Sequence, residues 1–301
     1  MEIIRPDSKY DFVAKRRWGF IISSILVLFS IIVMVKPGID LGVEFRGGWE
    51  IELAFGRQLP VEDLRAALLG SGRPLISAVE IQQLGDFEEG TYLIRGTGEA
   101  NEQAVLADLQ SGVSSLGTPE VLRFESVGAR VGSDLLDRGL ISLLMTLGGI
   151  LAYVSIRFSW RFAPGAILAL LHDVTVATGV ITLLGMEFTL PVLAALLALI
   201  GFSTNDTVVI YDRVRENLRR RRRPQLTTLF NVSLNEVLGR TIITSGALLV
   251  VSLALLIFGG SVLRDFATVL MVGIVAGTYS SIFIASAVTL EIERRWPGPK
   301  F

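Results

Sequence analysis

The stretch that decides the fold is TLPVLAALLALIGFSTNDTVVIY, residues 189–211, in which Asp206 is the only carboxylate and no basic side chain occurs. An α-helix rises about 1.5 Å per residue, so this run is long enough to cross the roughly 30 Å hydrocarbon core of a bilayer. A carboxylate in such a run is energetically unfavourable and occurs where it has a function or pairs with another polar group. We therefore interpret residues 189–211 as a membrane-spanning helix with a functional polar island.

The rest of the chain repeats this pattern. Hydrophobic residues make up 51% of the 301 residues and charged residues only 19%, less than the quarter typical of soluble domains. The six apolar runs that predict membrane-spanning helices are residues 18–35, 139–156, 162–184, 189–211, 241–259 and 268–290. A basic segment at residues 15–17 precedes the first run, but no small-residue cleavage site follows it, so we expect an uncleaved anchor.

Basic residues are concentrated on one side of this six-span chain. They occur in residues 1–17, between the second and third spans, in the 212–240 connection and in residues 291–301, whereas the third-to-fourth connection has none. Because cytoplasmic loops carry the Lys/Arg excess, both termini and the basic 212–240 loop are expected in the cytoplasm. The run Arg219–Arg223 is explained as a topology signal, and a net charge of −1 gives no reason to expect nucleic acid.

The long segment 36–138 between the first two spans has the pattern of a folded extracytoplasmic domain. Alternating or short apolar runs predict strands at residues 49–53, 78–84, 91–95 and 121–127, and helical spacing predicts helices at 61–69 and from the N-cap Asn101 to Leu109. The order β-α-β-β-α-β is that of a ferredoxin-like fold. The predicted fold class is thus a polytopic α-helical membrane protein with six transmembrane helices plus an α+β ferredoxin-like domain.

Charged residues in the spans are the candidate functional sites. Asp206 and its neighbour Asn205 lie in a polar island in the cytoplasmic third of the fourth span, and Arg240 opens the fifth span at a similar depth. These residues predict a proton or ion pathway in which an ionised Asp206 pairs with Arg240. The alternative is that Asp206 is a helix-end carboxylate that reaches the water, and that Arg240 is an interfacial anchor.

Two weaker patterns accompany this pair. His172 and Asp173 lie near the middle of the third span, where they could serve ion movement or structural hydrogen bonding, and the sequence leaves both open. Since neighbouring helix residues point about 100° apart, both cannot face one pore squarely. Gly273 and Gly277 form a G-x-x-x-G motif whose expected role is close helix packing.

Several chemistries are not supported by the residues present. The chain has no cysteine and one histidine, so a thiolate site or a multi-histidine metal centre is not expected. No metalloprotease, hydrolase-elbow or Walker A motif occurs. We expect neither an enzyme nor a bound cofactor.

The chain resembles the SecF family, the smaller subunit of the SecDF component of the bacterial Sec translocase. The fourth span and its exit, ALLALIGFSTNDTVVIYDRVREN (residues 195–217), carry the strongest likeness. Further matches are GIDLGVEFRGG (38–48), VGARVG (127–132), IRFSWRF (156–162), RTIITS (240–245) and GTYSSIFIAS (277–286). The family motif after the first span includes Asp40, Gly47 and Gly48, although the loop is longer here than the family's usual Gly-x-Asp-Phe-x-Gly-Gly.

The resemblance implies a function and partners. SecF-like proteins resemble half of a resistance-nodulation-division transporter, form a heterodimer with SecD in the bacterial inner membrane, and use the proton or sodium gradient to assist late, ATP-independent translocation of unfolded polypeptides with SecYEG; YajC is a further candidate partner. The family's intramembrane charges correspond to Asp206 and Arg240. The alternatives are half of such a transporter for a small molecule or lipid, and a purely structural assembly subunit.

Overall fold

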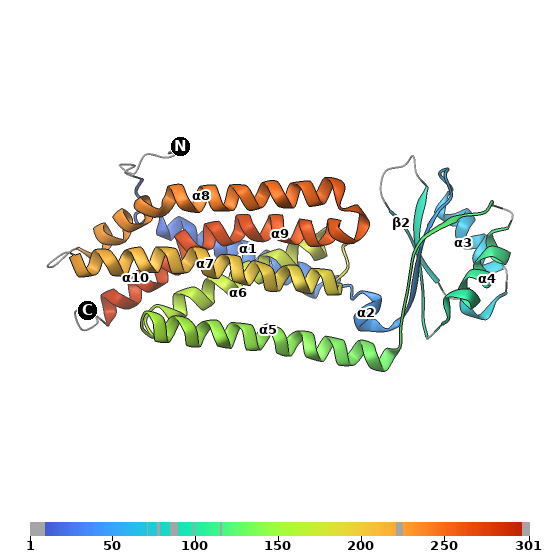
Figure 1. The fold of residues 1–301 in the computed structure, drawn as a ribbon, viewed down its shortest axis with the longest axis horizontal. Coiled ribbons are helices and arrows are strands. Elements are labelled where there is room, and N and C mark those ends of the chain that lie inside the picture. The colour runs from blue at the N-terminus through green and yellow to red at the C-terminus, as the bar shows by residue number, and fades with distance from the viewer. Residues whose placement is uncertain are drawn as a thin grey trace. The chain divides into compact units, whose positions relative to one another are not determined.

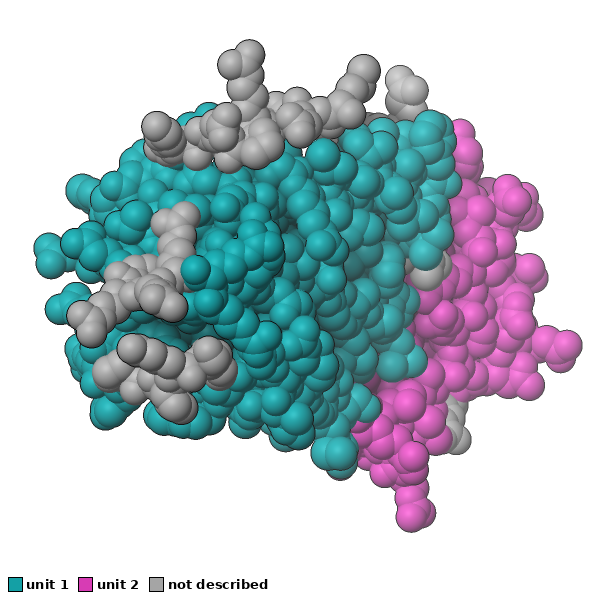
Figure 2. All heavy atoms as spheres, turned by 60° about the vertical axis from the view of Figure 1, so that its left-hand side comes forward, with its two compact units in different colours: residues 1–40, 141–301 teal, residues 41–140 magenta. Residues whose placement is uncertain are grey.

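The computed structural model describes residues 10–70, 72–76, 79–84, 90–98, 100–114, 116–220 and 225–296. The chain divides into two compact units, residues 1–40 with 141–301 and residues 41–140 (Figure 2). The first unit is helical, and the second contains the sheet (Figure 1). Each unit has its own hydrophobic core.

Six helical stretches in the described residues are long and apolar enough to cross a membrane, which confirms the predicted number of spans. Five of them are α1 (Arg16–Val35), α5 (Ala129–Arg157), α6 (Ala163–Leu183), α7 (Leu190–Arg220) and α8 (Leu226–Phe258). The sixth consists of α9 (Gly260–Ser280), the π-helical turn η2 (Ser281–Ala285) and α10 (Ser286–Arg295). π-helical turns inside α-helices are rare and often accompany functional sites.

The helices are longer than the apolar runs that predict them. α7 continues to Arg220 and α8 begins at Leu226, so most of the 212–240 segment is helical and not an irregular loop. Glu216 pairs with Arg213 and Arg220, at the spacing that stabilises an exposed helix. The two extensions also pack on each other, because Asn217 Nδ2 donates to Ser233 Oγ at 3.0 Å. Hydropathy alone misses these extensions, since their stability comes from ion pairs and packing.

The centre of the helical unit is formed by α6, α7 and α9. α6 and α7 carry buried residues along most of their length, and α9 packs against α6, α7 and α8. α1 contacts α6, and its large apolar side chains, such as Ile25 and Leu28, are exposed. Exposed apolar surface of this kind on a spanning helix faces lipid or another membrane helix.

The α+β unit contains one four-stranded antiparallel sheet. Its elements are α2 (Val43–Arg46), β1 (Gly48–Ala54), α3 (Val61–Gly70), the 3₁₀ turn η1 (Pro74–Ile76), β2 (Val79–Leu84), β3 (Thr91–Gly96), α4 (Glu102–Val113) and β4 (Glu120–Val127). The strands lie in the order β2-β3-β1-β4. α4 begins where predicted, because Asn101 Oδ1 accepts from the backbone N–H of Gln103 at 3.0 Å.

The two faces of β1 differ in chemistry. Trp49, Ile51 and Leu53 lie in one hydrophobic core with residues of α3 and α4, which places both helices on the same face of the sheet. Glu50 and Glu52 alternate with these residues and point to the opposite face, yet each is only 7% exposed. Arg95 Nε on β3 lies 3.5 Å from Glu50 Oε2.

Burial raises the pKa of Glu50, and the nearby positive charges of Arg95 and Arg123 only partly oppose this shift. A carboxyl whose pKa is higher in the folded than in the unfolded state stabilises the fold when protonated. That contribution is complete below the ordinary value of 4.5 and is lost as the pH rises through the folded-state value. The ionised Glu50 therefore destabilises the α+β unit at neutral pH.

We expect residues 41–140 to fold alone and Glu50→Gln to raise the melting temperature of that fragment at pH 7, with the difference vanishing near pH 4, because Gln removes the buried charge. Thermal unfolding followed by circular dichroism at both pH values checks this. Glu80→Gln is the matched control, since the side chain of Glu80 is 71% exposed. A gain that is the same at both pH values would contradict the assigned role of charge burial, and an uncooperative melt would contradict independent folding.

Candidate functional site

A buried carboxylate, Asp173, connects the three central helices. Its side chain on α6 is fully buried, and its Oδ2 accepts hydrogen bonds from Ser203 Oγ on α7 at 2.6 Å and from Ser280 Oγ on α9 at 2.8 Å. Oδ1 lies 2.9 Å from Nδ1 of His172. The side chain of Asp173 thus links α6 to α7 and to α9. Its partner on α9, Ser280, is the last residue before the π-helical turn.

His172 contacts Asp173 and also borders a cavity. Its ring lines an apolar cavity of about 530 Å³ together with Leu26 on α1 and Tyr279 on α9. The His172 and Tyr279 ring centroids are 6.1 Å apart. Nε2 is buried and finds no hydrogen-bond partner among the described residues.

Asp206 lies one turn beyond Ser203 on the same face of α7. Three helical residues rise about 4.5 Å, so the Asp173 cluster and Asp206 follow each other along one helix face. Asp206 is 2% exposed, and its Oδ2 has no hydrogen-bond partner among the described residues. A buried carboxylate without such a partner is costly when ionised. Groups of this kind in spanning helices mark ion or proton pathways.

The predicted direct pair between Asp206 and Arg240 is not formed in this structure. Within the described part of the chain, no ion pair or hydrogen bond joins the two side chains, although Arg240 still acts on Asp206 electrostatically through space. The reason is the orientation of α8: Thr241 faces the bundle and is 1% exposed, whereas Arg240, about 100° round the helix, is exposed.

The side chains of Asn205 and Asp206 lie on different faces of α7. Asn205 is exposed, while Ser203, Asp206 and Thr207 are buried. The polar island of the sequence therefore has two faces, and only one contributes to the buried cluster. Helical periodicity places Asn205 and Asp206 on different faces of α7, but it does not determine which of these faces is buried.

The glycines of the G-x-x-x-G motif lie where α9 meets α7. A Cβ at Gly273 would lie 2.5 Å from the side chain of Leu199, and a Cβ at Gly277 would lie 3.2 Å from Cβ of Ser203 and 3.4 Å from Asp173 Oδ2. Glycine at both positions thus allows the close approach that brings Ser203 and Ser280 to one carboxylate.

The residues of the motif after the first span have backbone roles. The carbonyl of Asp40 accepts from the N–H of Phe188 at 2.7 Å. Gly47 and Gly48 have φ of +75° and +124°, and a Cβ at Gly48 would lie 2.5 Å from the carbonyl oxygen of Gly96. Only glycine fits this conformation at the entrance to β1 without strain.

Sequence reasoning did not assign the two serines that hold Asp173. Ser203 belongs to the polar island and Ser280 to the polar run after Gly277, but they are 77 positions apart in the chain, and no local pattern brings them together. No group of three His, Cys, Asp or Glu side chains that could hold a metal occurs in the described ranges.

These features define a multi-pass membrane protein whose central helices share a buried polar cluster. The profile of the family described as "Protein export membrane protein SecD/SecF, C-terminal" matches residues 108–295. "Protein translocase subunit SecF" of Calditerrivibrio nitroreducens is 40% identical over 97% of each chain, and that of Pseudomonas aeruginosa is 41% identical over 93% of this chain and 90% of its own. The chain belongs to the SecF family of protein translocase subunits.

Solved structures show the same likeness. The crystal structure of SecDF from Thermus thermophilus superposes with a TM-score of 0.87 at 36% identity and covers 96% of this chain. A SecDF structure described as the super-membrane-facing form gives 0.70 at 35% identity. This chain spans 39% of the length of either SecDF chain.

Asp173→Leu should destabilise the helical unit, because it removes three buried polar contacts and leaves the hydroxyls of Ser203 and Ser280 without their acceptor. Two of these contacts, to Ser203 and Ser280, join different helices. At roughly 0.6–1.7 kcal/mol per contact between membrane helices, the expected loss is about 1–3 kcal/mol. Thermal unfolding of the purified chain in detergent measures it. Asn205→Leu on the exposed face of α7 is the control and should change stability little; equal effects of the two substitutions would contradict the structural role of Asp173.

Proposed function

We propose that this chain assists protein export by coupling translocation to the proton or sodium gradient. In this proposal it forms a heterodimer with a SecD-like protein, and the heterodimer works beside SecYEG. YajC is a further candidate partner. The observation that carries the coupling role is Asp206, a buried carboxylate on a spanning helix with no hydrogen-bond partner among the described residues. Membership of the SecF family supports the export role.

The coupling step is the binding of a cation at Asp206. An elementary charge that crosses 100 mV releases about 2.3 kcal/mol, enough to change the ratio of two conformations by nearly fiftyfold. Neutralising Asp206 removes its attraction to Arg240 and so changes the free energy of placing α7 against α8. Because Ser203 on α7 donates to Asp173, a movement of α7 is transmitted to α6 and α9.

His172 and Asp173 have a positioning role in this proposal. Asp173 accepts from Ser203 on α7 and from Ser280 on α9, which holds α7 in place relative to α6 and α9 and thereby sets the position of Asp206. His172 holds the other oxygen of Asp173. The π-helical turn that follows Ser280 gives the sixth span a point at which it can change shape.

The proposed orientation follows the basic residues. Both termini and the helical extensions of α7 and α8 lie in the cytoplasm of a bacterial cell, and the α+β unit lies outside the inner membrane. We propose that this unit is a ferredoxin-like domain, which its chain order and its two helices on one face of the sheet support. It would contact the emerging unfolded polypeptide.

One exposed face of α7 has residues of the kind expected at a contact with a second membrane subunit. Ala194, Ala198, Gly201 and Asn205 are exposed at successive turns of this face. Small residues allow a second helix to approach closely, and an exposed amide in a span is unfavourable against lipid but can hydrogen-bond across helices. We propose that a SecD-like helix covers this face.

A topology experiment tests the orientation. The basic connections are retained on the inner side of the membrane. A reporter fused after Arg220 should therefore lie in the cytoplasm, and a reporter fused at Gly90 should lie outside it. Alkaline phosphatase and a fluorescent protein used in parallel give opposite readings at the two positions. Readings on the reversed sides would refute the orientation.

Asp206→Asn should abolish gradient-dependent export, since the amide keeps the size and polarity of the side chain but cannot bind and release a proton. Arg240→Met should reduce it strongly because the favourable field at Asp206 is lost. Both are measured as the change in export of a secreted substrate into inverted membrane vesicles when the gradient is dissipated. Asp212→Asn, the same substitution at a carboxylate that pairs with Arg157 on the surface of α7, is the control. Full gradient dependence in Asp206→Asn would disprove the coupling role.

Gly201→Leu should lower co-purification of a SecD-like subunit at least tenfold. A Cβ at Gly201 would have no atom of another described element within 4 Å, so we expect the substitution to block the approach of another helix while disturbing this chain little. Gly246→Leu on α8 also has open space and serves as the matched control. Pull-down from native membranes with quantitative mass spectrometry measures recovery. Unchanged recovery with Gly201→Leu would show that the subunit binds elsewhere, and recovery of a different partner would favour a small-molecule or lipid transporter.

A further inference from the structure

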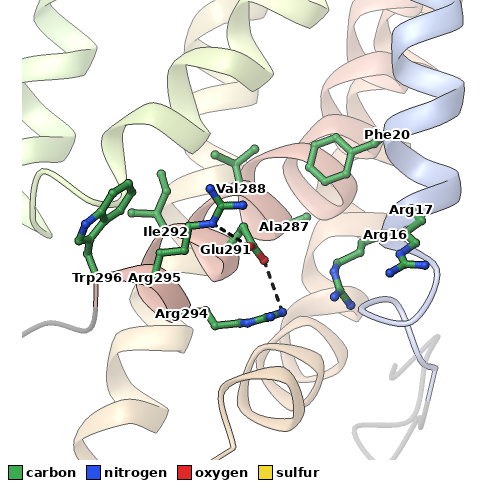
Figure 3. A pocket seen from close by; sticks show the side chains of 10 residues that line it. All are labelled: Arg16, Arg17, Phe20, Ala287, Val288, Glu291, Ile292, Arg294, Arg295 and Trp296. Carbon is green, nitrogen blue, oxygen red and sulfur yellow. Dashed lines mark hydrogen bonds and ion pairs between the residues drawn. The ribbon is translucent and has the colours of Figure 1, made fainter.

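A cavity of about 530 Å³ lies between the start of α1 and the end of α10, outside the polar cluster described above (Figure 3). Its lining contains four arginines and one glutamate among apolar side chains. The lining residues are Arg16, Arg17, Phe20, Ala287, Val288, Glu291, Ile292, Arg294, Arg295 and Trp296. The volume is in the range of pockets that hold small organic ligands.

The charges of this cavity are not balanced within the described residues. Glu291 is the one acid in the lining, and it contacts Arg294 at 3.7 Å and Arg295 at 3.0 Å (Figure 3). Arg16 Nη1 donates to the carbonyl of Val13, and Arg17 has no ion-pair partner in the part of the chain that the structure describes. The lining therefore carries a net positive charge, concentrated on the α1 side.

Polarity changes in the same direction along both walls. On α1, Arg16 and Arg17 lie at the helix start, and Phe20 follows one turn deeper in the span. On α10, Val288 lies deeper in the span, and Arg294 and Arg295 lie at its end. Both helix ends are at the same side of the membrane, since an even number of crossings separates them.

We propose that this cavity binds an anionic phospholipid, with the phosphate between the arginines of α1 and α10 and an acyl chain along Phe20 and Val288. Guanidinium groups bind phosphate oxygens through paired, charge-assisted hydrogen bonds. Basic pockets between spanning helices recognise anionic lipid head groups, and tryptophan at position 296 fits the membrane–water interface. The long 3.7 Å contact of Arg294 with Glu291 leaves that guanidinium able to bind the phosphate. The proposal does not depend on ion coupling at Asp206.

The test uses the full chain, purified and delipidated in detergent and titrated with dioctanoylphosphatidylglycerol, with bound lipid counted by native mass spectrometry. One lipid should bind at least tenfold more tightly than dioctanoylphosphatidylcholine, because only the former has a net negative charge. Millimolar inorganic phosphate should not displace it, since phosphate lacks the chain that contacts Phe20. Equal affinity for the two lipids, or displacement by phosphate, would overturn the proposal.

Two variants locate the site. Arg16→Gln with Arg17→Gln should weaken phosphatidylglycerol binding at least tenfold, and so should Arg294→Gln with Arg295→Gln on the opposite wall, which leaves the basic N-terminal segment and its topology signal intact. Arg219→Gln with Arg220→Gln at the end of α7 removes the same charge outside the cavity and should leave affinity unchanged. Equal loss in this control would show general charge attraction and refute a defined site, as would full affinity in both cavity variants.

Discussion

The hydrogen bonds that Asp173 accepts from Ser203 and Ser280 join α6, α7 and α9. The arrangement of the helices in the helical unit depends on these bonds. In a membrane, apolar side chains gain little by leaving lipid for each other, so close packing and polar contacts between helices decide how spans associate. Gly273 and Gly277 allow the close packing, and Asp173 forms the polar contacts, at the same helix crossing. This crossing then fixes where Asp206 lies.

The proposed function rests on a difference between two buried carboxylates. Asp173 is buried and has several partners, whereas Asp206, one turn further along the face of α7, is buried without a hydrogen-bond partner in the described residues. The first carboxylate is suited to hold helices in place and the second to respond to a cation. In the proposed mechanism, the side chains that neighbouring helices present give these two buried carboxylates different roles.

The surfaces of the helical unit are similarly divided. Exposed apolar side chains on α1 suit lipid, the small residues and Asn205 on α7 suit another helix, and the arginines at the ends of α1 and α10 suit an anionic head group. Each surface is defined by residue type and depth in the span. The α+β unit has its own division, with an apolar face on β1 under two helices and a face where burial raises the pKa of Glu50.

Six spans, the chain order of the α+β unit and the presence of Asp206 in a span are predicted from local pattern, because hydrophobic length and periodicity are local properties. Tertiary structure alone decided that Ser203 and Ser280 meet at Asp173, that Asn205 faces outward, and that Arg240 makes no direct contact with Asp206. These facts depend on how each helix is rotated about its axis. Rotation is set by contacts between residues far apart in the chain, such as Gly273 with Leu199, and no local pattern contains it.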